Sequence, residues 1–257
     1  MTDFNGISTR LTGALDLSQP PVAISLIDSI SPDDRKWTGP SPAGCRFWQE
    51  GMQGGFVTDA RDHDSCAIGI HTHNLEGTAA TDADLAQALG VFAELTYVRK
   101  EDIAQIPTMS RRARFVKYEP LADCGAAPDV ALLFVRANQA LIATEAAQQI
   151  DGGATPALGR PACAVVPQAA NLGRAALSLG CCGAREYLDV LSDEVAIFAI
   201  PGPKLEAFAE RIEALAKANR ILTQFHDIRK RQVASHENPS VSDTLAAMQS
   251  ESAAPRA

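Results

Sequence analysis

Short apolar runs alternate with amphipathic stretches along most of this chain. Leucine and phenylalanine recur at helical spacing in residues 81–95 and 205–215, which predicts amphipathic helices there. Six short runs have the composition and length of strands: residues 22–27, 56–58, 115–118, 128–135, 175–179 and 194–200. This mixture predicts an α/β fold, with α+β as the alternative, in which helices flank a mixed sheet.

The chain divides into a long ordered part and a polar end. Residues 1–220 are predicted to form a single α/β domain, followed by a C-terminal helix over residues 221–236. Residues 237–257 are polar and rich in serine, proline and alanine, so they are predicted to be a disordered tail.

The order of features repeats between two halves, residues 7–110 and 111–220. In each half a strand is followed by a proline and a nearby cysteine, Cys45 or Cys163. A short strand and a second cysteine, Cys66 or Cys181, come next, with a glycine after each. A true duplication would bring the four cysteines together at a pseudo-two-fold axis, whereas a chance likeness would leave them scattered.

Composition narrows the range of functions. The 257 residues are 46% hydrophobic and carry a net charge of −8, which disfavours nucleic acid and anionic membrane surfaces as partners. The start of the chain lacks the apolar segment of a signal peptide, and no run reaches the ~18 to 20 apolar residues of a membrane span. We therefore expect a cytoplasmic protein, whose thiols stay reduced and serve as core residues, metal ligands or nucleophiles.

The four repeated cysteines all lie at expected helix starts. Unpaired N–H groups and the helix dipole there favour the thiolate and lower its pKa below ~8.5. Four thiolates suit an iron–sulfur cluster, expected to be 4Fe-4S, or a tetrahedral zinc ion. We favour iron–sulfur, because structural zinc usually takes ligand pairs two to four residues apart. The alternatives are that these cysteines are core residues or that one of them is a lone catalytic nucleophile.

The two other cysteines are expected to have different roles. Cys124 is expected to be structural, and Cys182 to be a core residue or an exchange partner of Cys181.

Histidines and one arginine could complete such a site. His71 and His73 alternate and could supply nitrogen ligands or a general acid, and His63 lies between two aspartates just before Cys66. Arg185 follows Cys181 and could clamp a substrate carboxylate or stabilise a reduced cluster. The competing interpretations are that the histidines lie in solvated loops and that Arg185 forms a salt bridge with a nearby acidic residue.

Several short segments together resemble one known family. They are Pro21-Val-Ala, Cys45, Asp64-Ser65-Cys66, Pro128-Asp-Val, Cys163, Gly180-Cys181-Cys182-Gly183-Ala184-Arg185 and Asp193-Glu194. Their order is similar to that of the domain of unknown function 169 family, over roughly Leu11 to Arg220. The resemblance implies that Cys45, Cys66, Cys163 and Cys181 fit the family pattern, and it implies no reaction.

Three hypotheses follow. The first is a cytoplasmic iron–sulfur or other metal protein, with the four repeated cysteines as ligands, that performs redox or lyase chemistry on a small molecule. Arg185 and His71 or His63 would orient the substrate. The second is a metal-free enzyme with Cys181 as nucleophile and His63, His71 or His73 as base. The third is a small-molecule-binding or regulatory module with structural cysteines. The expected partners are a small-molecule substrate or a redox protein, and a homodimer is compatible with the sequence.

Overall fold

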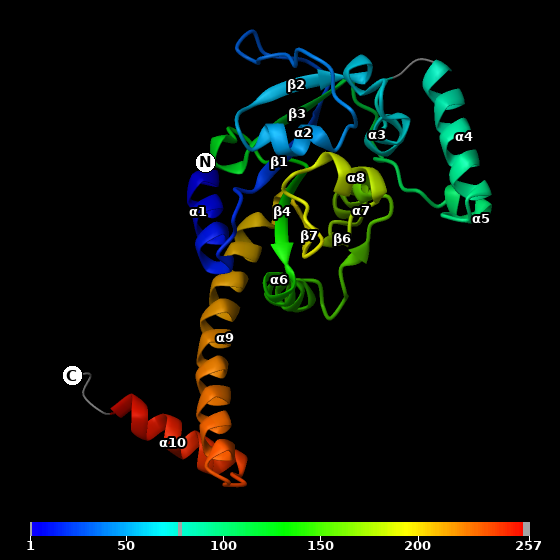
Figure 1. Cartoon of the computed structure of the whole chain (residues 1–257). Coiled ribbons are helices and arrows are strands. Elements are labelled where there is room, and N and C mark those ends of the chain that lie inside the picture. The colour runs from blue at the N-terminus through cyan, green and yellow to red at the C-terminus, as the bar shows by residue number, and fades with distance from the viewer. Residues whose placement is uncertain (1, 77–78, 254–257) are drawn as a thin grey trace.

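One mixed sheet of seven strands forms the centre of the molecule (Figure 1). The computed structural model describes residues 2–76 and 79–253. The strand order across the sheet is β2-β3-β1-β4-β7-β6-β5. The strands are β1 (Val22–Ile27), β2 (Phe56–Asp59), β3 (Phe115–Pro120), β4 (Val130–Arg136), β5 (Ala157–Leu158), β6 (Ala176–Ser178) and β7 (Val195–Pro201). Helices flank this sheet, which confirms the predicted α/β class.

The helices connect the strands and extend the C-terminus. They are α1 (Phe4–Leu15), α2 (Arg46–Gly51), α3 (Ala67–His73), α4 (Ala79–Glu94), α5 (Lys100–Ile103), α6 (Ala137–Ile150), α7 (Val165–Leu172), α8 (Cys182–Tyr187), α9 (Leu205–Ala234) and α10 (Val241–Ala253). Short 3-10 turns are η1 (Ala60–His63), η2 (Leu121–Asp123), η3 (Ala162–Ala164) and η4 (Gly202–Lys204).

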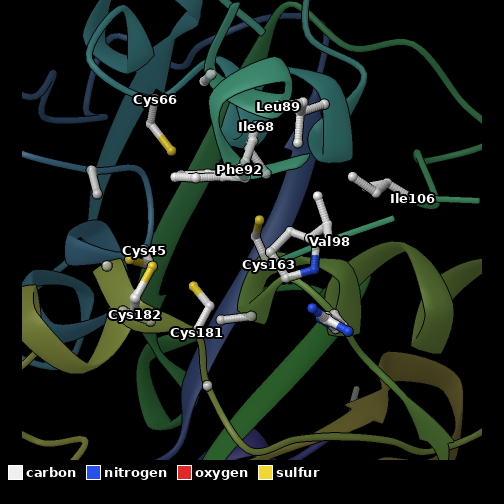
Figure 2. A pocket seen from close by; sticks show the side chains of 18 of the residues that line it. Cys45, Cys66, Ile68, Leu89, Phe92, Val98, Ile106, Cys163, Cys181 and Cys182 are labelled. Atoms are coloured by element: carbon white, nitrogen blue, oxygen red, sulfur yellow. The ribbon is translucent and has the colours of Figure 1, made fainter. Parts of the chain in front are cut away.

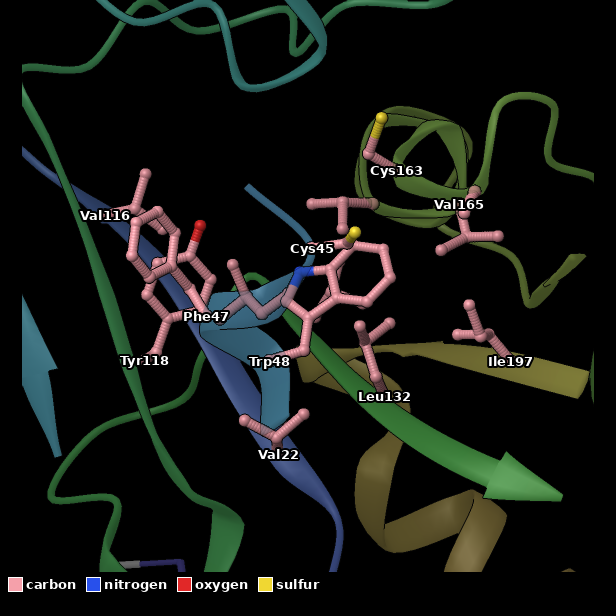
Figure 3. Close-up of a cluster of buried hydrophobic side chains, with 14 of the residues drawn as sticks. Val22, Cys45, Phe47, Trp48, Val116, Tyr118, Leu132, Cys163, Val165 and Ile197 are labelled. Atoms are coloured by element: carbon pink, nitrogen blue, oxygen red, sulfur yellow. The ribbon is translucent and has the colours of Figure 1, made fainter. Parts of the chain in front are cut away.

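The sheet separates two hydrophobic cores. Side chains alternate along a strand, so Leu132 of β4 joins one core and its neighbour Leu133 joins the other. Helices α1, α6 and α9 cover the second face, while α2, α7 and α8 pack on the first. Figure 3 shows part of the first core, where Trp48 packs near Leu132 and two cysteines, Cys45 and Cys163, border the cluster. The cysteine chemistry therefore lies on one face of the sheet.

Strand connectivity repeats on the two sides of the central β1–β4 pair. The first half has the order β1-β3-β2 outward from this pair, and the second half has β4-β7-β6. Val22 of β1 faces Pro120, and Val130 of β4 faces Pro201 in the same way. Helix α2 precedes β2 as η3 and α7 precede β6, and α3 follows β2 as α8 follows β6. These relations give Cys45 and Cys163 equivalent positions, and likewise Cys66 and Cys181.

The C-terminal end differs from the sequence prediction. Helix α9 continues unbroken for 30 residues, from Leu205 to Ala234, where a separate helix was expected from residue 221. The predicted disordered tail contains helix α10, because Ser240 and Asp243 cap its start and Thr244 is buried against Gln232 of α9. Both helices extend away from the sheet (Figure 1). Within the described ranges, no helix has both the length and the apolar composition needed to cross a bilayer.

Candidate functional site

Four cysteines from the two halves line one cavity of about 870 Å³. Cys45 and Cys66 come from the first half, and Cys163 and Cys181 from the second. Figure 2 shows the sulfur atoms of Cys66, Cys163 and Cys181 turned toward the same space. The cavity volume falls in the usual range for sites that bind small molecules, about 300 to 1,000 Å³. The convergence that a duplication would produce is therefore present.

Each of these cysteines stands at the beginning of a helical segment. Cys45, Cys66 and Cys181 are the N-cap residues of α2, α3 and α8, and Cys163 lies in the 3-10 turn that leads into α7. Cys66, Cys163 and Cys181 follow shortly after the ends of β2, β5 and β6, whereas Cys45 follows a longer loop after β1. The short connections thus deliver sulfur atoms from four distant points of the chain to one place.

Burial dominates the protonation of three thiols. Only 8% of Cys45 and 7% of Cys163 is exposed, and this desolvation raises the pKa of both thiols, that of Cys163 well above its usual range. Burial also raises the pKa of Cys66, although the N–H groups of Gly44 and Gly69 act in the opposite direction. The predicted lowering by helix starts is therefore wrong for these three, because desolvation outweighs the dipole. A metal that binds here must displace thiol protons.

Two glycines allow His63 to pack closely beside Cys66. A Cβ atom on Gly69 would come within 3.3 Å of both the Cys66 sulfur and Nδ1 of His63. A Cβ atom on Gly44 would approach the same nitrogen to 2.9 Å, closer than real side chains allow. Both positions therefore require glycine for the His63 ring to reach its place behind the Cys66 sulfur.

Several buried polar atoms near the cysteines have no hydrogen-bond partner within the described residues. They are the hydroxyl of Tyr118, the indole N–H of Trp48, Nδ1 of His63 and Nε2 of His73. Tyr118 is fully buried and interacts electrostatically with Cys45, Cys66 and Cys163. Unpaired buried polar groups cost about 1–3 kcal/mol each, so several in one place require an explanation such as a missing ligand.

The histidines singled out by sequence lie behind or beside the cavity. His63 is fully buried, and its Nε2 atom pairs with the hydroxyl of Thr58 at 3.0 Å. His73 is also fully buried and its Nδ1–H donates to the carbonyl of Gly69 at 2.9 Å. Nε2 of His71 lies 3.3 Å from the carbonyl oxygen of Ile106. None of the three lines the cavity, within the part of the chain that the structure describes.

Arg185 has a structural role instead of the predicted contact with substrate. Its guanidinium donates to the carbonyl oxygens of Leu179, Ser192 and Val195, which closes the loop around α8. Most of its donors are thereby used, and the side chain does not line the cavity. Arg160 does line it, and its guanidinium lies over the ring of Tyr97 at 5.6 Å from the centroid. Arg160 stands three residues before Cys163, beside the Pro161–Cys163 segment that the repeat pattern had singled out.

The wall opposite the cysteines is apolar. Leu89 and Phe92 of α4 line it together with Val98 and Ile106 from the segment that follows (Figure 2). The apolar stripe of α4 was visible in the sequence as a helix signal. Its role as a cavity wall was missed, because the stripe does not indicate what the helix packs against.

The two remaining cysteines differ from the four. Cys182 is exposed at the cavity, and its backbone N–H donates to the hydroxyl of Tyr97 at 3.4 Å. Its equivalent in the first half is Ala67, so it lies outside the repeat. Cys124 lies away from the cavity near Glu119, and burial raises the pKa of its thiol to about 12.

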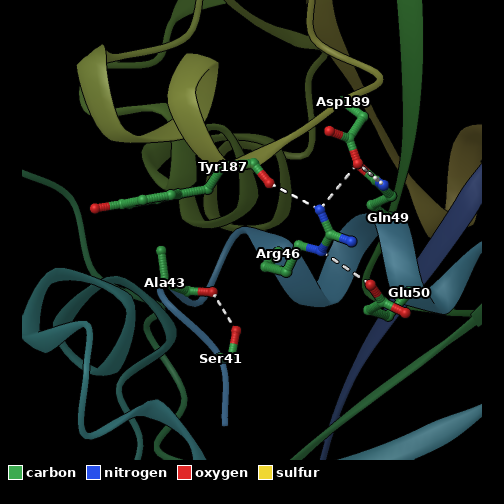
Figure 4. A network of polar contacts seen from close by, with 7 residues as sticks. All are labelled: Ser41, Ala43, Arg46, Gln49, Glu50, Tyr187 and Asp189. Atoms are coloured by element: carbon green, nitrogen blue, oxygen red, sulfur yellow. Dashed lines mark hydrogen bonds and ion pairs between the residues drawn. The ribbon is translucent and has the colours of Figure 1, made fainter.

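A polar network joins the helices that carry Cys45 and Cys181 (Figure 4). The Arg46 guanidinium donates to Glu50 on its own helix, to the carbonyl of Tyr187, and to Asp189. Gln49 donates to the same Asp189 carboxylate at 2.9 Å. The network holds the start of α2 against the end of α8 and so fixes the relative position of the two halves at the cavity.

A single metal ion would require the cysteine sulfur atoms to lie close together. Around one tetrahedral zinc ion the sulfur atoms lie about 3.8 Å apart, given Zn–S bonds of about 2.3 Å. Among the described residues, no three His, Cys, Asp or Glu side chains are placed to hold one metal ion. A cluster of several irons holds its ligands farther apart, because each cysteine binds a different iron.

Fold and cavity together define an α/β protein of two similarly connected halves, with cysteines from both around a cavity of small-molecule size. The chain belongs to the domain of unknown function 169 family (DUF169), described as uncharacterised ArCR, whose family model matches residues 10–211. The predicted resemblance is confirmed, and the match includes Cys45, Cys66, Cys163 and Cys181. No curated protein and no solved structure matches the chain.

Proposed function

We propose that this protein holds an iron–sulfur cluster on Cys45, Cys66, Cys163 and Cys181, and uses it in redox or lyase chemistry on a small molecule. The observation that carries the proposal is the cavity itself, into which two similarly connected halves each contribute two cysteines. Thiolates are the usual ligands of such clusters. The six cysteines are free, which agrees with the reducing cytoplasm where we place the protein.

The surroundings of the cysteines fit an anionic cluster. The hydroxyl of Tyr118 and the indole N–H of Trp48 are buried donors that lack acceptors. Cluster sulfides and cysteine thiolates are acceptors, so they would satisfy both groups. The cavity that the four cysteines line supplies the space for such a group. With all four cysteines bound, a cluster of this kind would supply one-electron transfer, and lyase chemistry would require that one iron lacks a cysteine ligand and can accept the substrate.

We favour a cluster over a zinc ion because the four cysteines are far apart in the sequence, whereas structural zinc usually takes ligand pairs two to four residues apart. The metal-free alternative with Cys181 as nucleophile has less support. It needs a base at the cavity, and no described histidine lines it.

Iron and labile sulfide analysis tests the proposal directly. Protein purified or reconstituted without oxygen should be brown and contain both elements. Replacing any one of Cys45, Cys66, Cys163 or Cys181 with serine should reduce the iron content and alter the visible spectrum. Cys124→Ser and Cys182→Ser are the matched controls and should retain both. Wild-type protein that takes up no iron, or four single variants that all keep a normal spectrum, would contradict the proposal.

A further inference from the structure

Arg160 places a guanidinium at the cavity, and most of its N–H groups have no acceptor among the described residues. One guanidinium N–H of Arg160 donates to the backbone carbonyl of Tyr97, and the group lies over the same tyrosine's ring. A guanidinium carries several N–H donors in one plane, so most of those of Arg160 are available to a ligand. No Asp or Glu in residues 2–76 or 79–253 forms an ion pair with it.

The carboxylates of the cavity form no ion pair with this arginine among the described residues. Asp102 also lines the cavity and is attracted electrostatically to Arg160, but its ion pair is with Arg99, whose guanidinium reaches its carboxylate at 2.6 Å. Glu186 lies on the exposed side of α8, outside ion-pair distance of Arg160. Arg185 is held by backbone carbonyls and does not line the cavity. Among the described residues that line the cavity, Arg160 is therefore the cation that a bound anion would contact.

An apolar surface completes the site. Leu89 is buried, and Phe92, Val98 and Ile106 surround the same space (Figure 2). A ligand with an apolar body would remove this surface from water on binding. Small-molecule sites typically combine such an apolar lining with a few polar groups that fix the orientation of the ligand.

We propose that the cavity binds a small organic acid, whose carboxylate or phosphate pairs with Arg160 and whose apolar body packs against Leu89 and Phe92. Arg160 and Cys163 are three residues apart, so their Cα atoms are at most about 11 Å apart. A molecule anchored on the arginine therefore reaches toward the cysteines. This inference names the substrate class of the proposed iron–sulfur site and rests on that function for its chemistry, although the binding step needs no iron.

Fluorine NMR titration tests the anion site with three probes. 4-Fluorophenylacetate and 4-fluorophenyl phosphate carry the two kinds of anion, and 4-fluorophenylacetamide is the neutral analogue of the first. We expect at least one anion to bind the wild-type protein about tenfold more tightly than the amide. The stronger of the two anions identifies the head group. Arg160→Ala should abolish the preference for charge, and Arg160→Gln provides a milder second variant.

Arg220→Ala is the control, because this exposed arginine lies on α9 away from the cavity. It should keep the preference for the anion. Equal binding of acid and amide to the wild type, no binding of any probe up to millimolar concentration, or a preference that persists without Arg160 would overturn the inference. Titrations with and without iron separate the two proposals, since iron analysis reports on the cluster and the fluorine signal reports on the anion site.

Discussion

The guanidinium of Arg46 donates a hydrogen bond to the carboxylate of Asp189 at 3.1 Å, and this contact joins the two halves next to the cavity. Arg46 directly follows Cys45, and Asp189 follows the helix that begins at Cys181. The same guanidinium also holds the carbonyl of Tyr187. The position of one cavity cysteine relative to another therefore depends on a polar contact between halves.

Removing this contact should affect the cluster more than the fold. Arg46→Ala should lower the free energy of unfolding by only about 1 kcal/mol, because its ion pairs are partly exposed. It should nevertheless speed the loss of iron, because the start of α2 is no longer tied to the end of α8. Chemical denaturation and the rate of iron release to a chelator measure the two effects. Arg10→Ala removes a comparable pair with Glu206 far from the cavity and should leave iron release unchanged.

The glycine beside Cys45 should not tolerate a side chain. In Gly44→Ala the new Cβ would press on Nδ1 of His63, which is fully buried and cannot move freely. We expect a loss of about 1–3 kcal/mol in the free energy of unfolding, together with lower iron content. Gly54→Ala is the matched control, because nothing lies within 4 Å of the added atom. Equal urea midpoints for the two variants would show that the space between Gly44 and the His63 ring is not tightly packed.

The Tyr118 hydroxyl should influence the cluster without being needed for the fold. No group in the described chain meets the geometry of a hydrogen bond to it, although the Thr58 side chain lies nearby, so Tyr118→Phe should change the stability of the iron-free protein little. In the iron-loaded protein the lost hydrogen bond should lower the reduction potential, because donors to sulfur stabilise the more negative reduced state. Redox titration of the visible spectrum measures the shift.

Tyr187→Phe is the comparison for that measurement, since Tyr187 also lines the cavity but is 39% exposed, so its hydroxyl can bond to water. The reduction potential of the cluster in Tyr187→Phe should match that of the wild-type protein. A potential unchanged in Tyr118→Phe would mean that the hydroxyl does not reach a cluster sulfur, and it would leave the unpaired buried oxygen without this explanation.

The sequence was most informative where a local pattern determines the structure. The strands β4 and β7 were found because both are continuous apolar runs, which only burial can accommodate. The repeated order of strand, proline and cysteine led to the set of four cysteines now found around one cavity. These features depend on periodicity and on order along the chain, which a sequence displays directly.

Features that depend on distant contacts were not predictable. Helix α10 is stabilised by Arg231–Glu251 and by the buried Thr244, and neither contact can be read from a polar tail. The raised pKa of Cys163 comes from burial under other elements, which no helix signal reveals. The sequence singled out Arg185 and not Arg160, and only the surrounding carbonyls show that Arg185 is already engaged.

The two buried histidines make the free energy of unfolding depend on pH. Burial lowers the pKa of His63 to about 3 and that of His73 to about 4, from 6.5 in an unfolded chain. The folded protein therefore keeps both rings neutral, while the unfolded chain takes up protons once the pH falls below 6.5. Their stabilising contribution is fully present above that pH and is lost as the pH falls toward 4, with a slope of up to about 1.4 kcal/mol per pH unit for each ring.

Urea denaturation of the iron-free protein between pH 7.5 and about 4.5 measures this dependence. His73→Gln should flatten the fall in the free energy of unfolding, because the substituted side chain binds no proton in either state. Its stability at pH 7.5 should be lower, since the glutamine must replace a buried ring that bonds to Gly69. His226→Gln is the control, because that ring is exposed on α9 and should leave the slope as it is in the wild type. A slope that is the same in the wild type and in His73→Gln would mean that folding does not lower the pKa of His73, which contradicts a neutral buried ring at this position.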